Sequence, residues 1–338
     1  MDSNDIKQRL TTAIENHLKE SIQRHYKRFD ALFLEMITYH LGWSGPGACL
    51  QTQGKRLRPM LMLLCTAALG EDWRKALPAA TSVEILHNFT LIHDDVQDDS
   101  PLRHGRPTVW KKFGIPQAIN AGDALFSTSQ LLMLELTQYF STEKVRQACL
   151  ILNQAALNLS FGQFLDISFE SRLDVSVESY LEMISNKTGV LISAATEIGA
   201  LLGSQEANLA NLAAEFGLSL GLAFQIQDDY LGIWGETEKI GKSTASDLTS
   251  HKKTLPILYG LQHQAEFAEQ WLRGPITPQT APQCADLLER EGAKAYTRSL
   301  ADKYTKKALE ALHAFSKQDN EYAKYLESLT LMLLERDK

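Results

Sequence analysis

The sequence lacks several features that would place it in a special structural class. Its first five residues are polar and acidic, and no basic segment followed by an apolar one marks a signal sequence. The longest apolar stretches, such as residues 60–69, fall short of the ~20 residues that a membrane helix needs. The four cysteines form no metal-ligand spacing and lie far apart: Cys49, Cys65, Cys149 and Cys284. We therefore predict reduced thiols, a cytoplasmic location and no transmembrane segment.

Positive charge is also scarce. The chain has 34 lysines and arginines against 41 acidic residues, which gives a formal net charge of −7. This balance argues against a general nucleic-acid binder, because such proteins need a basic surface. Any anionic ligand must therefore be held by a local cluster of basic residues.

What the chain does contain is helical pattern. Its 338 residues are 44% hydrophobic and 22% charged, which is typical of a globular protein with a sizeable core. Long stretches with apolar spacing near 3.6 are broken by Gly/Pro clusters at residues 42–54, 100–108, 234–251 and 273–282. Strand-like alternation is nearly absent, and no change of composition marks a linker. We predict an all-α fold in a single domain over residues 1–338.

The first unusual helix is expected over residues 78–96. It carries His87, Asp94 and Asp95, and Asp98 follows; at 100° per residue all four fall on one stripe. Like charges one turn apart need a shared counter-charge, and Mg²⁺ suits carboxylate ligands completed by water and phosphate oxygens. A solvated acidic helix end is the alternative for residues 94–99.

The second unusual helix is expected over residues 215–233. It is apolar nearly all round, as a buried central helix should be, yet Gln225, Asp228 and Asp229 share one face. Carboxylates on a buried helix are costly unless a positive group meets them. The acidic pair therefore predicts a second wall for a cation site.

Several basic residues have the character needed to hold a diphosphate. The loop Gly54-Lys55-Arg56-Leu57-Arg58-Pro59 leads into a helix, where backbone N–H groups also favour anions. Arg103 and His104 follow the first acidic cluster in a Pro/Gly loop, and further lysines lie downstream. Each lysine alone is more often a solvated surface charge.

As an ordered set, these motifs resemble the trans-isoprenyl diphosphate synthases, also called polyprenyl synthetases. The family's first aspartate-rich motif resembles residues 91–99 followed by 102–108, and its second resembles residues 224–232. The other matching elements stand in the family's order: Gly54 to Pro59, Gly162-Gln163 with Asp166, Lys187-Thr188-Gly189, Gly241-Lys242 with Asp247-Leu248, and Lys252 to Pro256. The resemblance spans about residues 50–260.

The resemblance implies a large helical bundle around a central cavity, in a homodimer, with the two aspartate motifs facing each other. Asp94 and Asp98 would bind two Mg²⁺ ions and Asp228 a third, with Asp95 and Asp229 in support. The isopentenyl diphosphate set would be Lys55, Arg58 and His87, with His104 at the position of a further arginine. The allylic diphosphate set would be Arg103, Lys187, Lys242 and Lys252, and Thr188 and Gln225 would line the reaction centre.

The implied reaction joins isopentenyl diphosphate to an allylic diphosphate. Metal ions and basic residues would neutralise the departing diphosphate, which is stabilisation of charge that develops on a leaving group. The double bond of isopentenyl diphosphate would attack the allylic cation, and the pyrophosphate would take the proton. Apolar helices must exclude water, because water would convert the cation to an alcohol.

Three departures from the family pattern concern the fine structure of the site. His104 replaces the second arginine after the first motif, which predicts weaker binding of isopentenyl diphosphate at high pH. Gly232 replaces the last aspartate of the second motif, and His251 replaces the usual glycine before Lys252.

Product length is expected to depend on side chains about one turn before the first aspartate. Phe89 and Thr90 lie five and four positions before Asp94. One aromatic without a second resembles the C20, geranylgeranyl, pattern. Alternatively, Phe89 is an ordinary core residue and the floor lies deeper.

Other functions fit less of the sequence. Gly241-Lys242-Ser243 ends like a P-loop, but Glu236 stands where that motif needs glycine. A His/Asp metal-dependent phosphohydrolase could use His87, His93 and Asp94, but it leaves the second acidic pair unexplained. A class I terpene cyclase would not need the isopentenyl diphosphate set, and a regulatory subunit would have lost the acidic ligands.

Overall fold

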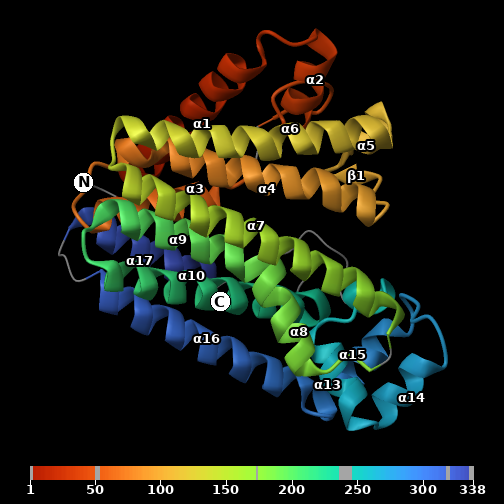
Figure 1. The fold of residues 1–338 in the computed structure, drawn as a ribbon. Helices are drawn as coiled ribbons and strands as arrows, with labels where there is room; N and C mark the ends of the chain where they lie inside the picture. Colours follow the sequence, from red (N-terminus) through yellow and green to blue (C-terminus); the bar gives the residue numbers. More distant parts are fainter. Residues whose placement is uncertain (1–2, 50–53, 173, 236–245, 317–319, 335–338) are drawn as a thin grey trace. The chain divides into compact units, whose positions relative to one another are not determined.

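The computed structural model describes residues 3–49, 54–172, 174–235, 246–316 and 320–334, and these are almost entirely helical (Figure 1). The α-helices are α1 (Ser3–Tyr26), α2 (Ala31–His40), α3 (Leu57–Ala68), α4 (Leu77–Gln97), α5 (Val109–Phe113), α6 (Ile115–Leu134), α7 (Thr142–Ser171), α8 (Val177–Ile184), α9 (Val190–Gly203), α10 (Ala207–Trp234), α12 (Ser246–Thr249), α13 (Leu255–His263), α14 (Glu266–Leu272), α15 (Ala281–Arg290), α16 (Ala293–Phe315) and α17 (Glu321–Leu334). The other elements are two 3₁₀ turns, η2 (Trp73–Ala76) and η3 (Glu135–Gln138), the π-helix η4 (Ser185–Gly189), and an antiparallel pair, β1 (Leu102–Arg103) and β2 (Arg106–Pro107). The predicted all-α fold is confirmed.

The chain divides into two compact units. The first comprises residues 1–156, 194–213 and 316–326, and the second comprises residues 157–193, 214–315 and 327–338. The single domain over residues 1–338 stays a prediction.

In the first unit, α4 and α6 run alongside each other (Figure 1). Helix α4 has Pro78 in its first turn, where a missing N–H costs nothing, and it ends at Gln97 with Asp98 as its cap, close to the predicted bounds of 78–96. Buried Ile85 and Ile92 belong to the same apolar cluster as Leu125 of α6. This packing fixes the helix that carries the first aspartate motif.

In the second unit, α8, α10 and α13 share one apolar cluster. It includes Tyr180 of α8, Ile226 of α10 and Leu258 of α13, all of them buried. The predicted helix over residues 215–233 lies inside α10, and its apolar circumference is explained by this burial. The cluster therefore holds the helix of the second aspartate motif on more than one side.

Two helices are long and apolar enough to cross a membrane by length and composition alone. These are residues 142–171 and 208–234, and 56% of the apolar window of the second is buried inside the structure. The sequence contains no uninterrupted apolar stretch of that length, because a few polar residues interrupt each of these two helices. Core helices pass the same test, so the absence of a transmembrane segment stays a prediction.

Candidate active site

The first aspartate motif lies at the C-terminal end of α4. Asp94 is half-buried, Asp95 is only 2% exposed, and Asp98 is exposed at the helix cap. The backbone N–H of Asp98 donates to the Asp94 carbonyl at 2.8 Å, which continues the helical turn. The two outer carboxylates are therefore accessible, whereas the middle one is part of the protein's interior.

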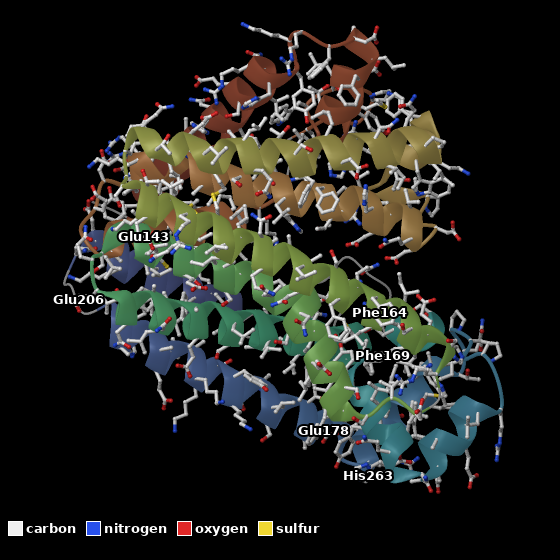
Figure 2. All side chains as sticks on the ribbon, in the orientation of Figure 1. Glu143, Phe164, Phe169, Glu178, Glu206 and His263 are labelled. Atoms are coloured by element: carbon white, nitrogen blue, oxygen red, sulfur yellow. The ribbon has the colours of Figure 1, made fainter. Side chains whose placement is uncertain are left out.

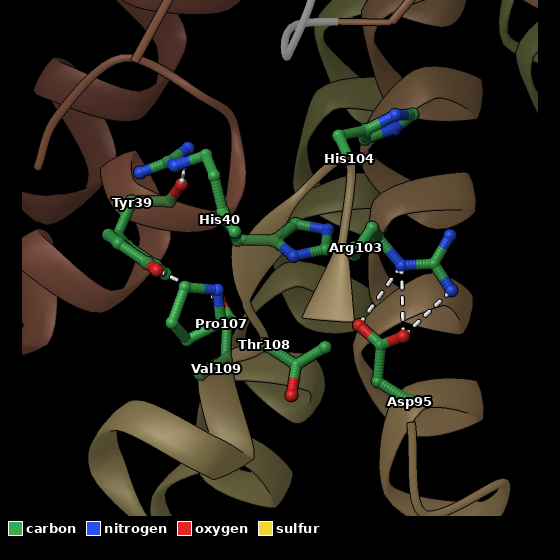
Figure 3. A pocket seen from close by; sticks show the side chains of 9 residues that line it. Tyr39, His40, Asp95, Arg103, His104, Pro107, Thr108 and Val109 are labelled. Carbon is green, nitrogen blue, oxygen red and sulfur yellow. Dashed lines mark hydrogen bonds and ion pairs between the residues drawn. The ribbon is translucent and has the colours of Figure 1, made fainter. Parts of the chain in front are cut away.

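Asp95 is held by Arg103. The guanidinium Nε donates to both carboxylate oxygens, at 2.9 and 3.0 Å, and Nη2 lies 2.8 Å from Oδ1 (Figure 3). Burial raises the pKa of Asp95, and the guanidinium opposes that shift. Two left-handed residues, His104 (φ 51°) and Gly105 (φ 73°), turn the chain from β1 to β2 and leave His104 exposed.

The basic loop before α3 separates a structural arginine from candidate ligands. Arg56 is buried and forms ion pairs with Glu15 at 2.6 Å and Glu84 at 2.7 Å. Lys55 is exposed, and Arg58 is half-buried with an Nε that has no hydrogen-bond partner in the described chain. The structure thus assigns Arg56 to packing, and the binding of a ligand by Lys55 and Arg58 stays a prediction.

His87 lies on α4 in the field of this basic cluster. Its pKa is held well below the ordinary value, first by burial and then by the charges of Arg58 and Arg103, with smaller contributions from His40 and Arg56. A neutral imidazole here avoids crowding another positive charge among the arginines. An incoming anion would reverse that preference.

A cavity beside the β1–β2 turn was not found from the sequence. It is lined by Tyr39, His40, Asp95, Arg103, His104, Arg106, Pro107, Thr108 and Val109 (Figure 3). Tyr39 and His40 stand at the end of α2, outside any recognised motif, so no spacing signal could have revealed them. Arg106 attaches that end to the hairpin by donating to the Tyr39 and Ser44 carbonyls, at 3.2 and 2.7 Å.

The side chains of the two candidate chain-length residues, Phe89 and Thr90, make different contacts. The Phe89 ring lies 5.3 Å from that of Phe126 on α6 and 4.8 Å from that of His93. Thr90 is 6% exposed, and its hydroxyl donates to the His87 carbonyl at 2.8 Å. Phe89 therefore packs against α6, whereas Thr90 is turned back onto its own helix.

The second aspartate motif repeats the exposed–buried alternation. Asp228 is exposed, and Asp229 is 2% exposed. Asp229 accepts hydrogen bonds from the Tyr180 hydroxyl at 2.5 Å, the Leu255 backbone N–H at 3.2 Å and the Gln225 amide at 3.1 Å. Burial raises the pKa of Asp229 to about 6, although these donors act in the opposite direction.

Lys187 and Thr188 lie in the π-helix η4. The Thr188 hydroxyl donates to the Gln225 amide oxygen at 3.1 Å, so a hydrogen-bonded chain runs from Thr188 through Gln225 to Asp229. A Cβ at Gly162 would lie 2.3 Å from the Lys187 backbone nitrogen, so only glycine permits this approach. Lys187 forms an ion pair with Asp166.

The remaining motif residues are explained locally. Burial lowers the pKa of Lys252, but the carboxylates of Asp229 and Asp166 outweigh it and raise the pKa overall. A Cβ at Gly232 would lie 2.2 Å from Asp247 Oδ2, so the Asp247 carboxylate fills the space of the missing aspartate.

His251 has a left-handed backbone, with φ 53°, and this conformation explains why the family usually has glycine at this position. The Nε2 atom of His251 accepts a hydrogen bond from the Ile276 N–H. Lys242 and the P-loop-like Gly241-Lys242-Ser243 lie outside the described residues.

The exposed carboxylates suit magnesium. Within the described ranges, no group of three or more His, Cys, Asp or Glu side chains forms a metal cage. Magnesium needs none, since it takes one or two carboxylates and completes its shell with water and phosphate oxygens. Asp94 with Asp98, and Asp228, supply that kind of ligand. Their opposition across a cavity stays a prediction, since the two motifs belong to different units.

An all-α fold with two aspartate pairs and a buried basic cluster defines a class of helical enzymes that act on diphosphates. The model of the polyprenyl synthetase family matches residues 47–289. The chain therefore belongs to this family and is a trans-prenyltransferase. Its substrates are isoprenyl diphosphates, and the family generally depends on a divalent metal.

Named relatives agree on the class but not on the product. The chain is 34% identical to a (2E,6E)-farnesyl diphosphate synthase of Mycobacterium tuberculosis, over 84% of this chain and 80% of the relative. It is 32% identical to a geranylgeranyl diphosphate synthase of Sulfolobus acidocaldarius, over 94% and 95%. A crystal structure of a geranylgeranyl pyrophosphate synthetase from Pyrococcus horikoshii superposes with a TM-score of 0.88 at 30% identity, covering 99% of this chain and 98% of the other.

Proposed function

We propose that this chain condenses isopentenyl diphosphate head to tail with an allylic diphosphate and releases geranylgeranyl diphosphate, with Mg²⁺ as cofactor. The observation that carries the proposal is the coexistence of two sets of groups. The accessible carboxylates of Asp94, Asp98 and Asp228 suit allylic ionisation, while Lys55 and Arg58 form no ion pair within the described chain, the Glu84 carboxylate acting on Arg58 only from a distance. A terpene cyclase needs only the first set.

The chain's own residues divide the work by charge. Arg58, His87 and His104 would hold the diphosphate of isopentenyl diphosphate, and Lys187 and Lys252 would hold that of the allylic substrate, as would Arg103 and Lys242 by resemblance. Magnesium, when bound, would neutralise the allylic diphosphate as its carbon–oxygen bond breaks. The isopentenyl double bond then forms the new carbon–carbon bond, and the released pyrophosphate takes the proton.

Thr188 and Gln225 would stabilise positive charge near the reacting carbon. The Thr188 hydroxyl donates to Gln225, and the Gln225 amide donates to Asp229, so the dipoles of both side chains have a fixed direction. Fixed dipoles act on a transition state without reorganising, which is what electrostatic catalysis requires. The buried Asp229 would position Gln225, and the buried Asp95 would position Arg103, rather than bind metal directly.

A single incubation series tests the proposal. Purified protein is supplied with Mg²⁺, isopentenyl diphosphate and one allylic diphosphate of C5, C10 or C15, and products are identified by mass. Elongated diphosphates ending at C20 are expected. Cyclic hydrocarbons would indicate the cyclase, phosphate release without elongation would indicate a phosphohydrolase, and a C15 end product would correct the chain length.

Phe89 provides the test of product length. Because its ring packs on Phe126 of α6, the pair forms a thick apolar barrier that the growing chain would meet. Phe89→Ala is expected to lengthen the main product by at least one C5 unit, as measured by mass spectrometry. Thr90→Ala, at the second chain-length position, is measured alongside and should change the product less, since the Thr90 hydroxyl bonds to its own helix. Unchanged products with Phe89→Ala would show that the floor lies elsewhere.

We also propose a homodimer in the cytoplasm. Helix α7 exposes four large apolar side chains whose spacing places them on one stripe: Leu150, Leu157, Phe161 and Phe164. Phe164, which is labelled in Figure 2, is 62% exposed. Helix α6 adds the exposed Ile115, Ile119, Leu131 and Leu134. Light scattering should give twice the chain mass, and Phe161→Asp with Phe164→Asp should give the monomer. Recovery of the protein only from membranes would contradict the location.

A further inference from the structure

The cavity beside the β1–β2 turn contains a histidine that no motif assigns. His40 is the last residue of α2, and it faces the same cavity as Arg103 and His104 (Figure 3). Its place is fixed, because the Tyr39 hydroxyl donates to the Pro107 carbonyl at 2.8 Å and Arg106 donates to the Tyr39 carbonyl at 3.2 Å. These bonds hold the neighbouring Tyr39 and fix where α2 ends, which sets the position of His40 beside the cavity.

His40 is not fully satisfied by the protein. Its Nε2 is buried and has no hydrogen-bond partner among the described residues, and the same is true of Arg58 Nε. A buried polar atom without a partner costs about 1–3 kcal/mol, so such atoms are uncommon unless a ligand completes them. His40 and Arg58 both act on the charge of His87, so these two unpartnered nitrogens belong to the same basic cluster.

The groups around His40 carry an excess of positive charge, which would also attract an anion. The cations and imidazoles that act on His40 or its neighbours are Arg56, Arg58, His87, Arg103, His104 and Arg106. The nearby acids are already used, since Asp95 pairs with Arg103, and Glu15 and Glu84 pair with Arg56. Burial, followed by the charges of Arg103, Arg56 and His104, lowers the pKa of His40 to about 3, although a hydrogen bond with Asn88 opposes this.

We propose that His40 is a further binding group for the diphosphate of isopentenyl diphosphate: Nδ1 keeps its hydrogen bond to the Asn88 amide oxygen, and the ring takes up a second proton from solvent as the anion binds and donates it from Nε2. The inference rests on the proposed function, because it takes the diphosphate from that reaction. The homoallylic substrate is favoured over the allylic one because His104 lines the same cavity and the charge of His40 acts on His87, although Arg103 of the allylic set lines the cavity too. His40 thereby offsets part of what the replacement of arginine by His104 removes.

Two isosteric substitutions separate the Nε2 atom from the rest of the ring. His40→Asn keeps a polar atom near the Nδ1 position and removes Nε2, whereas His40→Gln places an amide nitrogen near Nε2. Binding of isopentenyl diphosphate alone, with no allylic substrate, is measured by calorimetry. His40→Asn is expected to bind about tenfold more weakly, the loss of one hydrogen bond to a charged group, and His40→Gln should recover part of this loss.

Kinetics provide a second measurement that a structural role would not reproduce. With His40→Asn, the KM for isopentenyl diphosphate should rise about tenfold, while the KM for the allylic diphosphate stays unchanged. His25→Asn is the control, because His25 lies on α1 outside the cavity, where its Nε2 is 3.4 Å from the Glu135 carboxylate. Thermal melting checks that each variant is folded.

The outcomes separate this inference from the function on which it rests. If the unsubstituted protein does not bind isopentenyl diphosphate, the proposed function is wrong. If it binds while His40→Asn binds equally well, or if both KM values rise together, only the role of His40 is wrong. Should the variants not fold, a crystal structure with isopentenyl diphosphate decides, since a diphosphate oxygen about 3 Å from His40 Nε2 supports the proposal and its absence overturns it.

Discussion

The two aspartate pairs follow one plan, but their buried members have opposite kinds of partner. Asp95 on α4 is held by the guanidinium of Arg103, whereas Asp229 on α10 is held by neutral donors from Tyr180, Leu255 and Gln225. In the first pair, the buried carboxylate of Asp95 is neutralised by the guanidinium that it contacts. In the second pair, the buried carboxylate of Asp229 is only solvated by dipoles, so its field still acts on Lys252.

The difference shows that two equal-looking motifs need not be equivalent. A cancelled charge contributes shape and stability but little field, while a dipole-solvated carboxylate keeps the surrounding lysines charged. The first members of the two pairs, the half-buried Asp94 and the exposed Asp228, remain comparable, since neither is fully buried. The two pairs can therefore be compared first at Asp94 and Asp228, which are alike, and then at Asp95 and Asp229, whose partners differ.

The largest effect is expected at the first members of the two pairs. Asp94→Ala and Asp228→Ala should each lower turnover about 1,000-fold, roughly 4 kcal/mol of transition-state stabilisation, because each removes a carboxylate that would hold a metal. Steady-state assays at saturating Mg²⁺ measure this effect, and circular dichroism should show unchanged helicity. Asp302→Ala, on the exposed face of α16, is the control. Turnover within a few fold of the unsubstituted enzyme would refute the assignment.

The next effect separates the two pairs. Arg103→Ala leaves the 2% exposed carboxylate of Asp95 without its counter-charge, and breaking a buried ion pair in this way costs about 3–4 kcal/mol. Chemical denaturation measures the loss. The control, Arg74→Ala, breaks an ion pair with Asp72 in which both side chains are largely exposed, and it should cost less than about 1 kcal/mol. Equal losses would mean that the Asp95 pair is not in fact buried.

A pH series tests the second pair, at the buried carboxylate of Asp229. The folded-state pKa of Asp229 is about 6, above the ordinary 3.8, so the folded protein binds more protons than the unfolded chain between these values. Stability from this group is present below pH 3.8 and is lost as pH rises through 6, by about 3 kcal/mol. Without divalent ions, the stability of the wild type relative to Asp229→Asn should fall by most of that amount, roughly 2.4 kcal/mol, between pH 4 and pH 7. A constant difference would show that Asp229 is ionised throughout.

How far the sequence predicted this arrangement depends on the residue. Helix α4 was predicted to within a residue or so at each end, because Pro78 and the Gly/Pro cluster after Asp98 mark its bounds. Spacing placed both aspartate pairs on helix faces but could not distinguish Asp94 from Asp95, since burial depends on the distant Arg103. Arg56 looked the same as Arg58 for a similar reason, as the partners of Arg56, Glu15 and Glu84, lie on other helices.

Two features had no sequence signal at all. His40 reaches the cavity only because α2 is attached to the β1–β2 hairpin by Arg106, a contact between residues 67 positions apart. The π-helix at Ser185–Gly189 also depends on a neighbour, since it needs the bare backbone of Gly162 beside it. Local pattern predicts helices and motifs, whereas these features depend on which helices come together.

The smallest effect that we predict tests the hydroxyl that holds Asp229. Tyr180→Phe keeps the ring in its apolar cluster and removes one donor to a buried carboxylate, which should cost about 2 kcal/mol, as expected for a hydrogen bond to a charged group. Tyr26→Phe is the matched control, because the buried Tyr26 hydroxyl pairs with the neutral Thr128 at 2.9 Å and its loss should cost about 1 kcal/mol. Because the Tyr180 hydroxyl lowers the pKa of Asp229, its removal should also move the stability transition above pH 6. Denaturation at several pH values measures both effects. Equal costs for the two tyrosines, with no pH shift, would mean that Asp229 is protonated and that the two aspartate pairs differ in charge as well as in partner.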